Sequence, residues 1–212
     1  MQACLSDTIN YITDFSIGRI PCNQEAVVSG VFDKIRKYES TPPLSSDFYR
    51  RGLHCAYFQD TYEDDSIADG QETEGYSFVQ TSEQIRDINL VLGKSEIDRV
   101  YAREEVAEKP YLLNNGNPIP DELKNDGMWL GNASSITESI EKGVSYIVYS
   151  GHGGSKGWWE PNFTDLSAML LENGDLLPVI FSSACHVGNF TDKTCLATAF
   201  LRNRFGGAVG MT

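Results

Sequence analysis

Short apolar segments alternate along the chain with segments in which apolar residues recur at every third or fourth position. The first pattern predicts strands and the second predicts helices. We predict strands over residues 15–20, 54–59, 97–102, 144–149 and 177–181, and a further strand from residue 208 onward. Residues 144–149 and 177–181 are continuously apolar, which is typical of parallel strands buried on both faces.

Five helices fall between these strands. We expect them over residues 23–38, 81–92, 134–140, 164–171 and 194–204. Asn23, Thr81 or Ser82, and Ser134 or Ser135 supply the N-caps, and Gly93 supplies a stop signal. Residues 109–131 are rich in Asn, Gly and Pro, so we expect a long connection there and not a core element.

The alternation of strands and helices predicts the fold class. We expect an α/β protein with a mostly parallel sheet and helices on both faces, in three layers. In such sheets, ligands bind beyond the carboxyl ends of the strands. The residues directly after each predicted strand are therefore the first place to look for chemistry.

Composition narrows the class of protein. With 17 Lys and Arg against 30 Asp and Glu, the 212-residue chain has a formal net charge of −13, which suits cations or basic substrates and not nucleic acid. No apolar run approaches the ~20 residues of a membrane span, and the first residues do not form a secretion signal. The five cysteines are odd in number and lack a CxxC spacing, so neither a zinc site nor a disulfide framework is indicated.

Two strand ends carry reactive side chains. Residues 144–149 lead into Ser150, Gly151, His152 and two further glycines, and residues 177–181 lead into Cys185. A Cys and a His at one sheet edge suit nucleophilic catalysis, in which the imidazole activates the thiol. The backbone N–H groups of Gly153 and Cys185 are candidates for an oxyanion hole. The alternative is a turn histidine and an inert buried thiol.

The motifs around these two residues resemble those of a known family. The Ser-Gly-His-Gly and Ala-Cys strand ends are similar to those of the caspase-like cysteine peptidases, and the wider sequence resembles the gingipain family most closely. Further resemblances lie in residues 14–21 and in the motifs Leu177-Pro178, Gly188-Asn189-Phe190, Cys195-Leu196-Ala197 and Gly206-Gly207-Ala208-Val209. The likeness covers nearly the whole chain and is weakest over residues 60–130.

The resemblance implies a cysteine endopeptidase that needs no cofactor for its chemistry. Cys185 is then the nucleophile and His152 the general base or acid. Cys195 matches a family position on the following helix and is not the nucleophile. We expect His186 to be a rim residue that becomes the base only if His152 faces away. Thr198 stands where gingipains usually carry a Glu, which puts a local polar contact in doubt.

A third catalytic member, an acid that orients the histidine, should lie in the loop after residues 54–59. Asp60 is our choice and Asp69 the next, although each could simply be a solvated carboxylate. Residues 60–74 hold seven acids and no base. They could form a solvated loop, a structural calcium site as in gingipains, or an acidic wall that favours Arg or Lys at P1. The sequence does not indicate which residues would bind a metal ion.

The pair Trp158-Trp159 comes shortly after the histidine. We predict that Trp158, more than Trp159, walls the substrate pocket with an aromatic face. Ordinary core packing is the alternative for both residues.

The extent of the chain also bears on function. Counting residues 54–59 as the first strand of a caspase-like sheet puts His152 after the third strand, Cys185 after the fourth, and the end of the chain inside the fifth. We therefore expect residues 1–212 to be a partial catalytic domain, truncated at both ends, with residues 1–45 as an upstream strand–helix segment. Its partners would be protein or peptide substrates and the remaining parts of a larger precursor.

We further expect a bacterial protein that is secreted or on the cell surface, with its signal outside this piece. Two alternatives to an endopeptidase stay open. One is a related transpeptidase or sorting enzyme of a secretion system, which shares the Cys–His pair. The other is a non-catalytic calcium-binding module that retains the fold.

Overall fold

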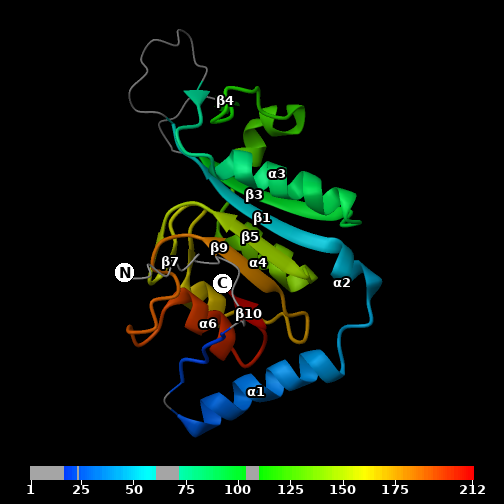
Figure 1. The fold of residues 1–212 in the computed structure, drawn as a ribbon, viewed down its shortest axis with the longest axis vertical. Coiled ribbons are helices and arrows are strands. Elements are labelled where there is room, and N and C mark those ends of the chain that lie inside the picture. The colour runs from blue at the N-terminus through cyan, green and yellow to red at the C-terminus, as the bar shows by residue number, and fades with distance from the viewer. Residues whose placement is uncertain (1–16, 23, 61–71, 104–109) are drawn as a thin grey trace, which may run out of the picture.

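The structure is a computed structural model and describes residues 17–22, 24–60, 72–103 and 110–212. Its centre is a parallel five-stranded sheet with the spatial order β10-β9-β5-β1-β3 (Figure 1). The strands are β1 (Arg51–Phe58), β3 (Glu96–Arg103), β5 (Tyr146–Ser150), β9 (Val179–Ser183) and β10 (Gly210–Met211). The prediction of a mostly parallel α/β sheet, with these five strands in this chain order, is confirmed.

Helices cover the sheet on both faces, as predicted. On one face lies α3 (Phe78–Val91), and on the other lie α4 (Ala133–Lys142), α5 (Asp165–Met169) and α6 (Leu196–Arg202) (Figure 1). Before the sheet come α1 (Glu25–Ser40) and α2 (Ser46–Arg50). No helix in the described part of the chain is long and apolar enough to cross a membrane.

The strand predicted over residues 15–20 is not found. Residues 15 and 16 lie outside the described residues, and residues 17–20 form no strand. Ile17 is 84% exposed, and the carbonyl of Pro21 accepts a hydrogen bond from the guanidinium of Arg202 on α6. The apolar residues of this segment are too few to form a strand of the sheet, and a polar contact holds its end instead.

Helix ends depend on capping side chains. The predicted N-cap of α4 at Ser134 or Ser135 is wrong, because the N-cap is Asn132, whose side chain accepts hydrogen bonds from the amides of both serines. The predicted N-cap of α3 at residue 81 or 82 is wrong, because this helix begins at Phe78. The amides of Val79 and Gln80 in its first turn donate to the carboxylate of Glu74. Glu74 lies before the apolar pattern from which the helix was predicted.

Buried side chains form two separate clusters on opposite sides of β1. The larger one packs β1, β5 and β9 against α4, α5 and α6, and includes Leu53, Cys55, Ile147 and Ile180. The smaller one lies on the α3 side. It consists of Ala56, Phe58, Val79, Tyr101, Leu113, Ile119, Leu123 and Trp129. Successive residues of β1 alternate between the two clusters, as the period of a strand requires.

The predicted long connection contributes to the smaller cluster. It contains β4 (Pro110–Leu112), which pairs with β2 (Glu72–Thr73), and two short 3₁₀ helices, η1 (Asp121–Lys124) and η2 (Asp126–Trp129). Leu123 and Trp129 are almost completely buried, and the Trp129 indole donates to the Leu123 carbonyl. The expectation that this region adds no core element is therefore wrong.

β9 is buried on one face only. Ile180 is fully buried, whereas Phe181 is 50% exposed. Because α6 and its neighbours cover one side of β9 and none of the described helices covers the other, the prediction of a strand buried on both faces holds for β5 and not for β9.

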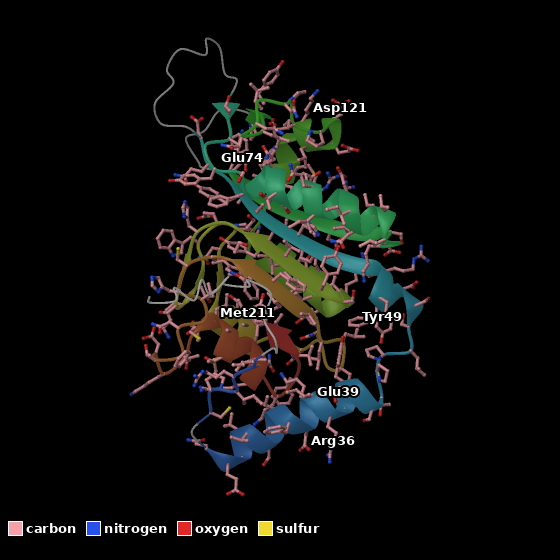
Figure 2. The ribbon with its side chains drawn as sticks, in the orientation of Figure 1. Arg36, Glu39, Tyr49, Glu74, Asp121 and Met211 are labelled. Atoms are coloured by element: carbon pink, nitrogen blue, oxygen red, sulfur yellow. The ribbon has the colours of Figure 1, made fainter. Side chains whose placement is uncertain are left out.

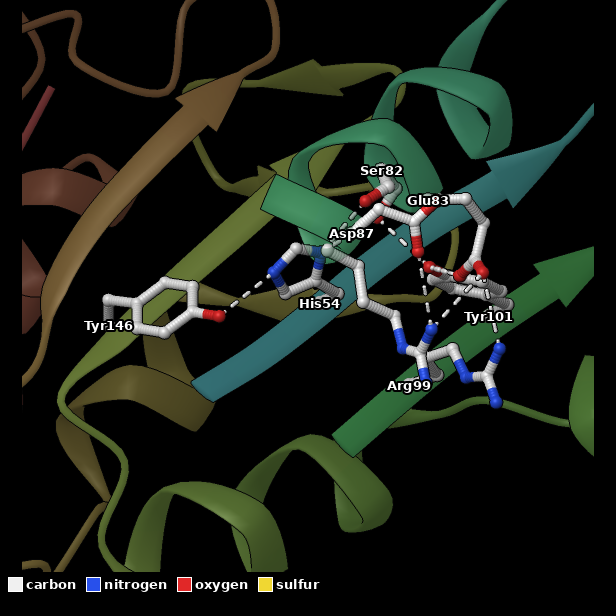
Figure 3. A network of polar contacts seen from close by, with 8 residues as sticks. His54, Ser82, Glu83, Asp87, Arg99, Tyr101 and Tyr146 are labelled. Carbon is white, nitrogen blue, oxygen red and sulfur yellow. Dashed lines mark hydrogen bonds and ion pairs between the residues drawn. The ribbon is translucent and has the colours of Figure 1, made fainter. Parts of the chain in front are cut away.

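A buried polar network joins α3 to the sheet (Figure 3). Nδ1 of His54 lies 3.1 Å from the carbonyl oxygen of Ser82 and Nε2 lies 3.3 Å from the Tyr146 hydroxyl. The Tyr101 hydroxyl lies 2.6 Å from the Glu83 carboxylate. Burial lowers the pKa of His54 to about 4, so the network is built around a neutral imidazole.

Candidate functional site

The two reactive strand ends lie side by side. β5 and β9 are neighbours in the sheet, and their register pairs Ser150 with Ser183. His152 and Cys185 each come two residues later, at the same edge of the sheet. The N–H of Gly151 donates to the Ser183 carbonyl at 3.3 Å and continues the contact beyond the strands. The prediction that the two residues follow neighbouring strands of the sheet is confirmed.

The loops that carry these residues are in direct contact. A Cβ atom added to Gly153 would lie 3.0 Å from Cβ of Ala184 and 3.2 Å from Cγ1 of Val187. Gly153 comes directly after His152, and Ala184 and Val187 flank Cys185. A side chain here would force the facing loop to move by a few tenths of an ångström, so the glycine favours this close approach of the two loops.

The Gly153 amide lies in a small antiparallel sheet made of β6 (Gly153–Gly154), β7 (Gly157–Trp158) and β8 (Phe163–Thr164). Gly153 is opposite Trp158, and the next bond of the ladder runs from Trp159 N–H to the His152 carbonyl. In an antiparallel ladder, hydrogen-bonded and non-hydrogen-bonded pairs alternate, and that bond makes Gly153–Trp158 a non-hydrogen-bonded pair. The N–H of Gly153 therefore does not bond to β7. The N–H of Gly153 is thus left available beside the Cys185 loop.

The backbone of the histidine loop is held by a buried tyrosine. The hydroxyl of Tyr149 lies 2.6 Å from the carbonyl oxygen of His152 and 3.1 Å from that of Glu160. Burial raises the pKa of Tyr149, so the hydroxyl keeps its proton and remains a donor. A Cβ atom on Gly151 would lie 2.7 Å from this hydroxyl oxygen, which explains the glycine before the histidine.

The imidazole of His152 has a side-chain partner that the sequence did not indicate. Its Nε2 lies 2.8 Å from Oε1 of Gln59, the residue directly after β1. An amide oxygen only accepts hydrogen bonds, so in this contact Nε2 of His152 is the donor. Asp60 is the next residue, and its backbone forms an isolated bridge with Glu74. Its role as third catalytic member stays a prediction.

Four aromatic rings surround the imidazole. The ring centroids lie 5.2 Å away for Phe78, 5.3 Å for Tyr76, 5.9 Å for Trp159 and 6.3 Å for Tyr57. Sequence reasoning missed the rings of Tyr57, Tyr76 and Phe78. Tyr57 belongs to β1, and the other two precede or open α3, so only the fold brings them to the histidine.

The choice of Trp158 as a wall of the substrate pocket is wrong. Its side chain is completely buried, is stacked on Tyr149 at 4.4 Å between ring centroids, and donates from Nε1 to Oγ of Ser182. Trp159 is 58% exposed and is the tryptophan beside His152. Because successive residues of a strand point to opposite sides, only one of the two can enter the core at β7.

The other predicted residues also have defined places. Cys185 is exposed, whereas Cys55 and Cys195 are buried. Cys195 is the N-cap of α6, and its N–H donates to Oγ1 of Thr198 at 2.9 Å, which gives the threonine a local role at the start of the helix. His186 is exposed, with a positive φ of 58°.

The acidic loop is the remaining predicted feature. Asp69 and most of its acids fall in residues 61–71, outside the described residues, so the calcium site and the acidic P1 wall stay predictions. Within the described ranges, no group of three or more His, Cys, Asp or Glu residues could hold a metal ion.

Comparisons with known proteins agree with these features. The model of peptidase family C25 matches residues 2–212. Gingipain R2 of Porphyromonas gingivalis is 32% identical over 74 residues, which are 34% of this chain and 10% of that protein. The matched stretch covers a tenth or less of the length of the curated relatives, from 4% to 10%.

Two solved structures share the fold. The Arg specific cysteine proteinase gingipain R matches with a TM-score of 0.65 and 19% identity, over 90% of this chain and 37% of that one. The complex of the pro- and mature domains of Porphyromonas gingivalis RgpB matches with the same TM-score and identity, over 90% and 38%. At this identity the two structures establish the architecture alone.

Proposed function

Because the chain belongs to peptidase family C25, we propose that it forms the catalytic part of a cysteine endopeptidase with Cys185 as nucleophile and His152 as base. One observation supports the proposal above the others. The loops that carry the two residues leave neighbouring strands in register and contact each other through Gly153. Cys185 is exposed and His152 is half-buried, and thiol catalysis requires such an accessible thiol and imidazole at one rim.

The proposed reaction proceeds in two stages. Nδ1 of His152 takes the thiol proton, and the Cys185 thiolate attacks the scissile carbonyl carbon. The N–H groups of Gly153 and Cys185 stabilise the resulting oxyanion. The imidazolium then gives its proton to the departing amine, and a thioester remains. Water, deprotonated by the same imidazole, hydrolyses the thioester and restores the thiol.

Gln59 acts in this scheme as a positioning residue. Its amide oxygen accepts the Nε2 proton of His152 at 2.8 Å, which leaves Nδ1 free to take the proton from the thiol. A neutral amide fixes the ring and its tautomer but adds no negative charge to stabilise the imidazolium.

We extend the proposal to substrates with Arg or Lys at P1. Support comes from the acidic residues 60–74, which would attract a cationic side chain, and from the similarity to a proteinase described as Arg specific. We also propose a secreted or surface location and assembly within a larger precursor, on the resemblance to gingipains.

Covalent labelling tests the central claim. A peptidyl chloromethyl ketone with Arg at P1 should add to Cys185, as located by mass spectrometry of tryptic peptides. Cys185→Ala should abolish the adduct and His152→Ala should slow its formation, whereas Cys22→Ala, at a half-buried cysteine on the N-terminal side, should leave the rate unchanged. Undiminished labelling of Cys185→Ala would overturn the proposal. If the enzyme is labelled, its reaction products distinguish the two enzyme classes. A peptidase releases the hydrolysed acid, whereas a transpeptidase transfers the acyl group to an added amine.

A further inference from the structure

The aromatic rings around His152 include two that are open to solvent. Tyr76 is 49% exposed and Trp159 is 58% exposed, and both lie within 6 Å of the imidazole between ring centroids. They reach it from separate parts of the chain, one just before α3 and the other just after the histidine. The proposed mechanism gives these rings no chemical role.

Tyr76 is one half of a stacked pair. Its ring lies parallel to that of Phe78, with 5.2 Å between the centroids and 5° between the planes. Both rings meet the imidazole edge-on or nearly so, at 82° and 86°. The pair, which we call the Tyr76–Phe78 stack, therefore forms a flat apolar surface beside the candidate base.

The backbone that carries the stack is firmly held. Glu74 is completely buried and lies at the N-terminal end of α3 (Figure 2), where its carboxylate accepts the amides of Val79 and Gln80. The next residue, Gly75, donates from its N–H to the Gln59 carbonyl at 2.7 Å. The segment that bears the stack is thus fixed at one end to α3 and at the other to the residue that orients His152. A surface held in this way loses little entropy on binding.

The position of the stack indicates which part of a substrate it meets. In the proposed reaction the imidazolium must reach the nitrogen of the leaving amine, within about 3 Å. That nitrogen belongs to the residue after the scissile bond, P1′, whose side chain is attached one carbon away. The surface next to the imidazole therefore faces the P1′ side chain.

The chemistry of the stack indicates what that side chain should be. Flat aromatic faces bind large apolar groups, and aromatic pairs gain stabilisation beyond the burial of area. A Lys or Arg would lie beside an imidazole that becomes positively charged during the reaction, and like charges at this distance repel. We propose that Tyr76, Phe78 and Trp159 form an S1′ subsite that accepts a large apolar side chain, aromatic or branched aliphatic. This inference rests on the proposed peptidase function.

The test is a series of peptides with Arg at P1 and Phe, Leu, Ala or Lys at P1′. We expect kcat/KM for Phe and Leu to exceed that for Ala by about fivefold, with Lys the poorest. Tyr76→Ala should bring the Phe-to-Ala ratio close to one. Tyr111→Ala, at a comparably exposed tyrosine on β4, is the matched control and should keep the wild-type ratio.

Labelling by the chloromethyl ketone separates the possible outcomes, because this reagent has no residue on the primed side. If the stack is a subsite, Tyr76→Ala lowers the Phe-to-Ala ratio of kcat/KM by a larger factor than it lowers the labelling rate. If Tyr76→Ala lowered kcat/KM equally for all peptides and lowered the labelling rate by the same factor, the subsite would be overturned. The stack would then only position His152. A wild-type ratio near one would overturn it as well. Absence of labelling in the wild-type protein would instead refute the peptidase function itself.

Discussion

His54 on β1 should make the stability of the fold depend on pH. It is completely buried between α3 and the sheet, and burial lowers its pKa to about 4 from the 6.5 of an exposed histidine. The charges of Arg86 and Arg99 act in the same direction. Between these pH values the unfolded chain binds a proton at His54 that the folded protein does not. The free energy of unfolding therefore falls as the pH is lowered from 6.5 to 4.

The size of the effect can be worked out from the two pKa values. They lie about 2.5 apart, and a difference of one corresponds to about 1.4 kcal/mol, so this histidine lowers the stability by about 3 kcal/mol at pH 4. That is a large fraction of the ~5–15 kcal/mol that holds a domain together. Above pH 6.5 the histidine is neutral in both states and the effect vanishes.

A second buried group acts in the opposite direction. Burial raises the pKa of Glu74 to about 7 from 4.5. Between these values the folded protein keeps a proton that the unfolded chain releases, so this group favours folding at low pH and the advantage is lost as the pH rises to about 7. Between about pH 4 and pH 7, the pH dependence of stability due to Glu74 is therefore opposite in sign to that due to His54. The wild-type curve alone does not isolate His54, and a difference between variants is required.

The assay is urea unfolding followed by circular dichroism at half-unit steps from pH 7.5 to 4. In His54→Gln, the side-chain amide can still donate to Ser82 and accept from Tyr146, but it does not titrate. The stability of the variant relative to wild type should rise by about 3 kcal/mol between pH 7 and pH 4. His186→Asn, at an exposed histidine with positive φ that Asn tolerates, should run parallel to wild type. A constant difference between His54→Gln and wild type would refute the reasoning.

Three further predictions concern the site and its support. Gln59→Leu removes the acceptor for Nε2 of His152 and should slow ketone labelling by about ten- to a hundredfold, with an unchanged urea midpoint; an unchanged labelling rate would contradict the role given to this amide. Gly153→Ala inserts a methyl group between the two loops and should lower stability by about 1–3 kcal/mol while slowing labelling, and wild-type behaviour in both assays would show that the contact is loose. Trp158→Ala should cost about 3–5 kcal/mol in urea unfolding, whereas Trp159→Ala should stay within about 0.5 kcal/mol; similar costs would contradict their opposite burial.

The sheet and the two strand ends could be predicted because their signals are local. An apolar segment that ends in Gly-His-Gly and another that ends in Ala-Cys each indicate, in a few residues, where a strand stops and which side chain comes after it. Parallel strands end at the same edge, so the rule of the fold brings His152 and Cys185 together without knowledge of any long-range contact.

The rest of the site depends on contacts that no local pattern shows. Gln59 meets His152 across 93 positions of sequence, and a neutral amide gives no signal when an acid is sought. Glu74 determines where α3 begins although it lies outside the helix. Trp158 and Trp159 are alike in local sequence, and only the pairing of β7 with its neighbours decides which one enters the core.

The alternation of β1 between two core clusters has a consequence for how the protein opens. Groups of residues that share a core tend to unfold together, at free energies below that of global unfolding. The smaller cluster holds α3 and the segment with the Tyr76–Phe78 stack, and the larger one lies beneath the strands that lead to His152 and Cys185. Hydrogen exchange should therefore divide the molecule into two cooperative units whose boundary runs beside the imidazole. Opening of the smaller unit alone would remove the stack from His152 and leave the contact between the His152 and Cys185 loops intact.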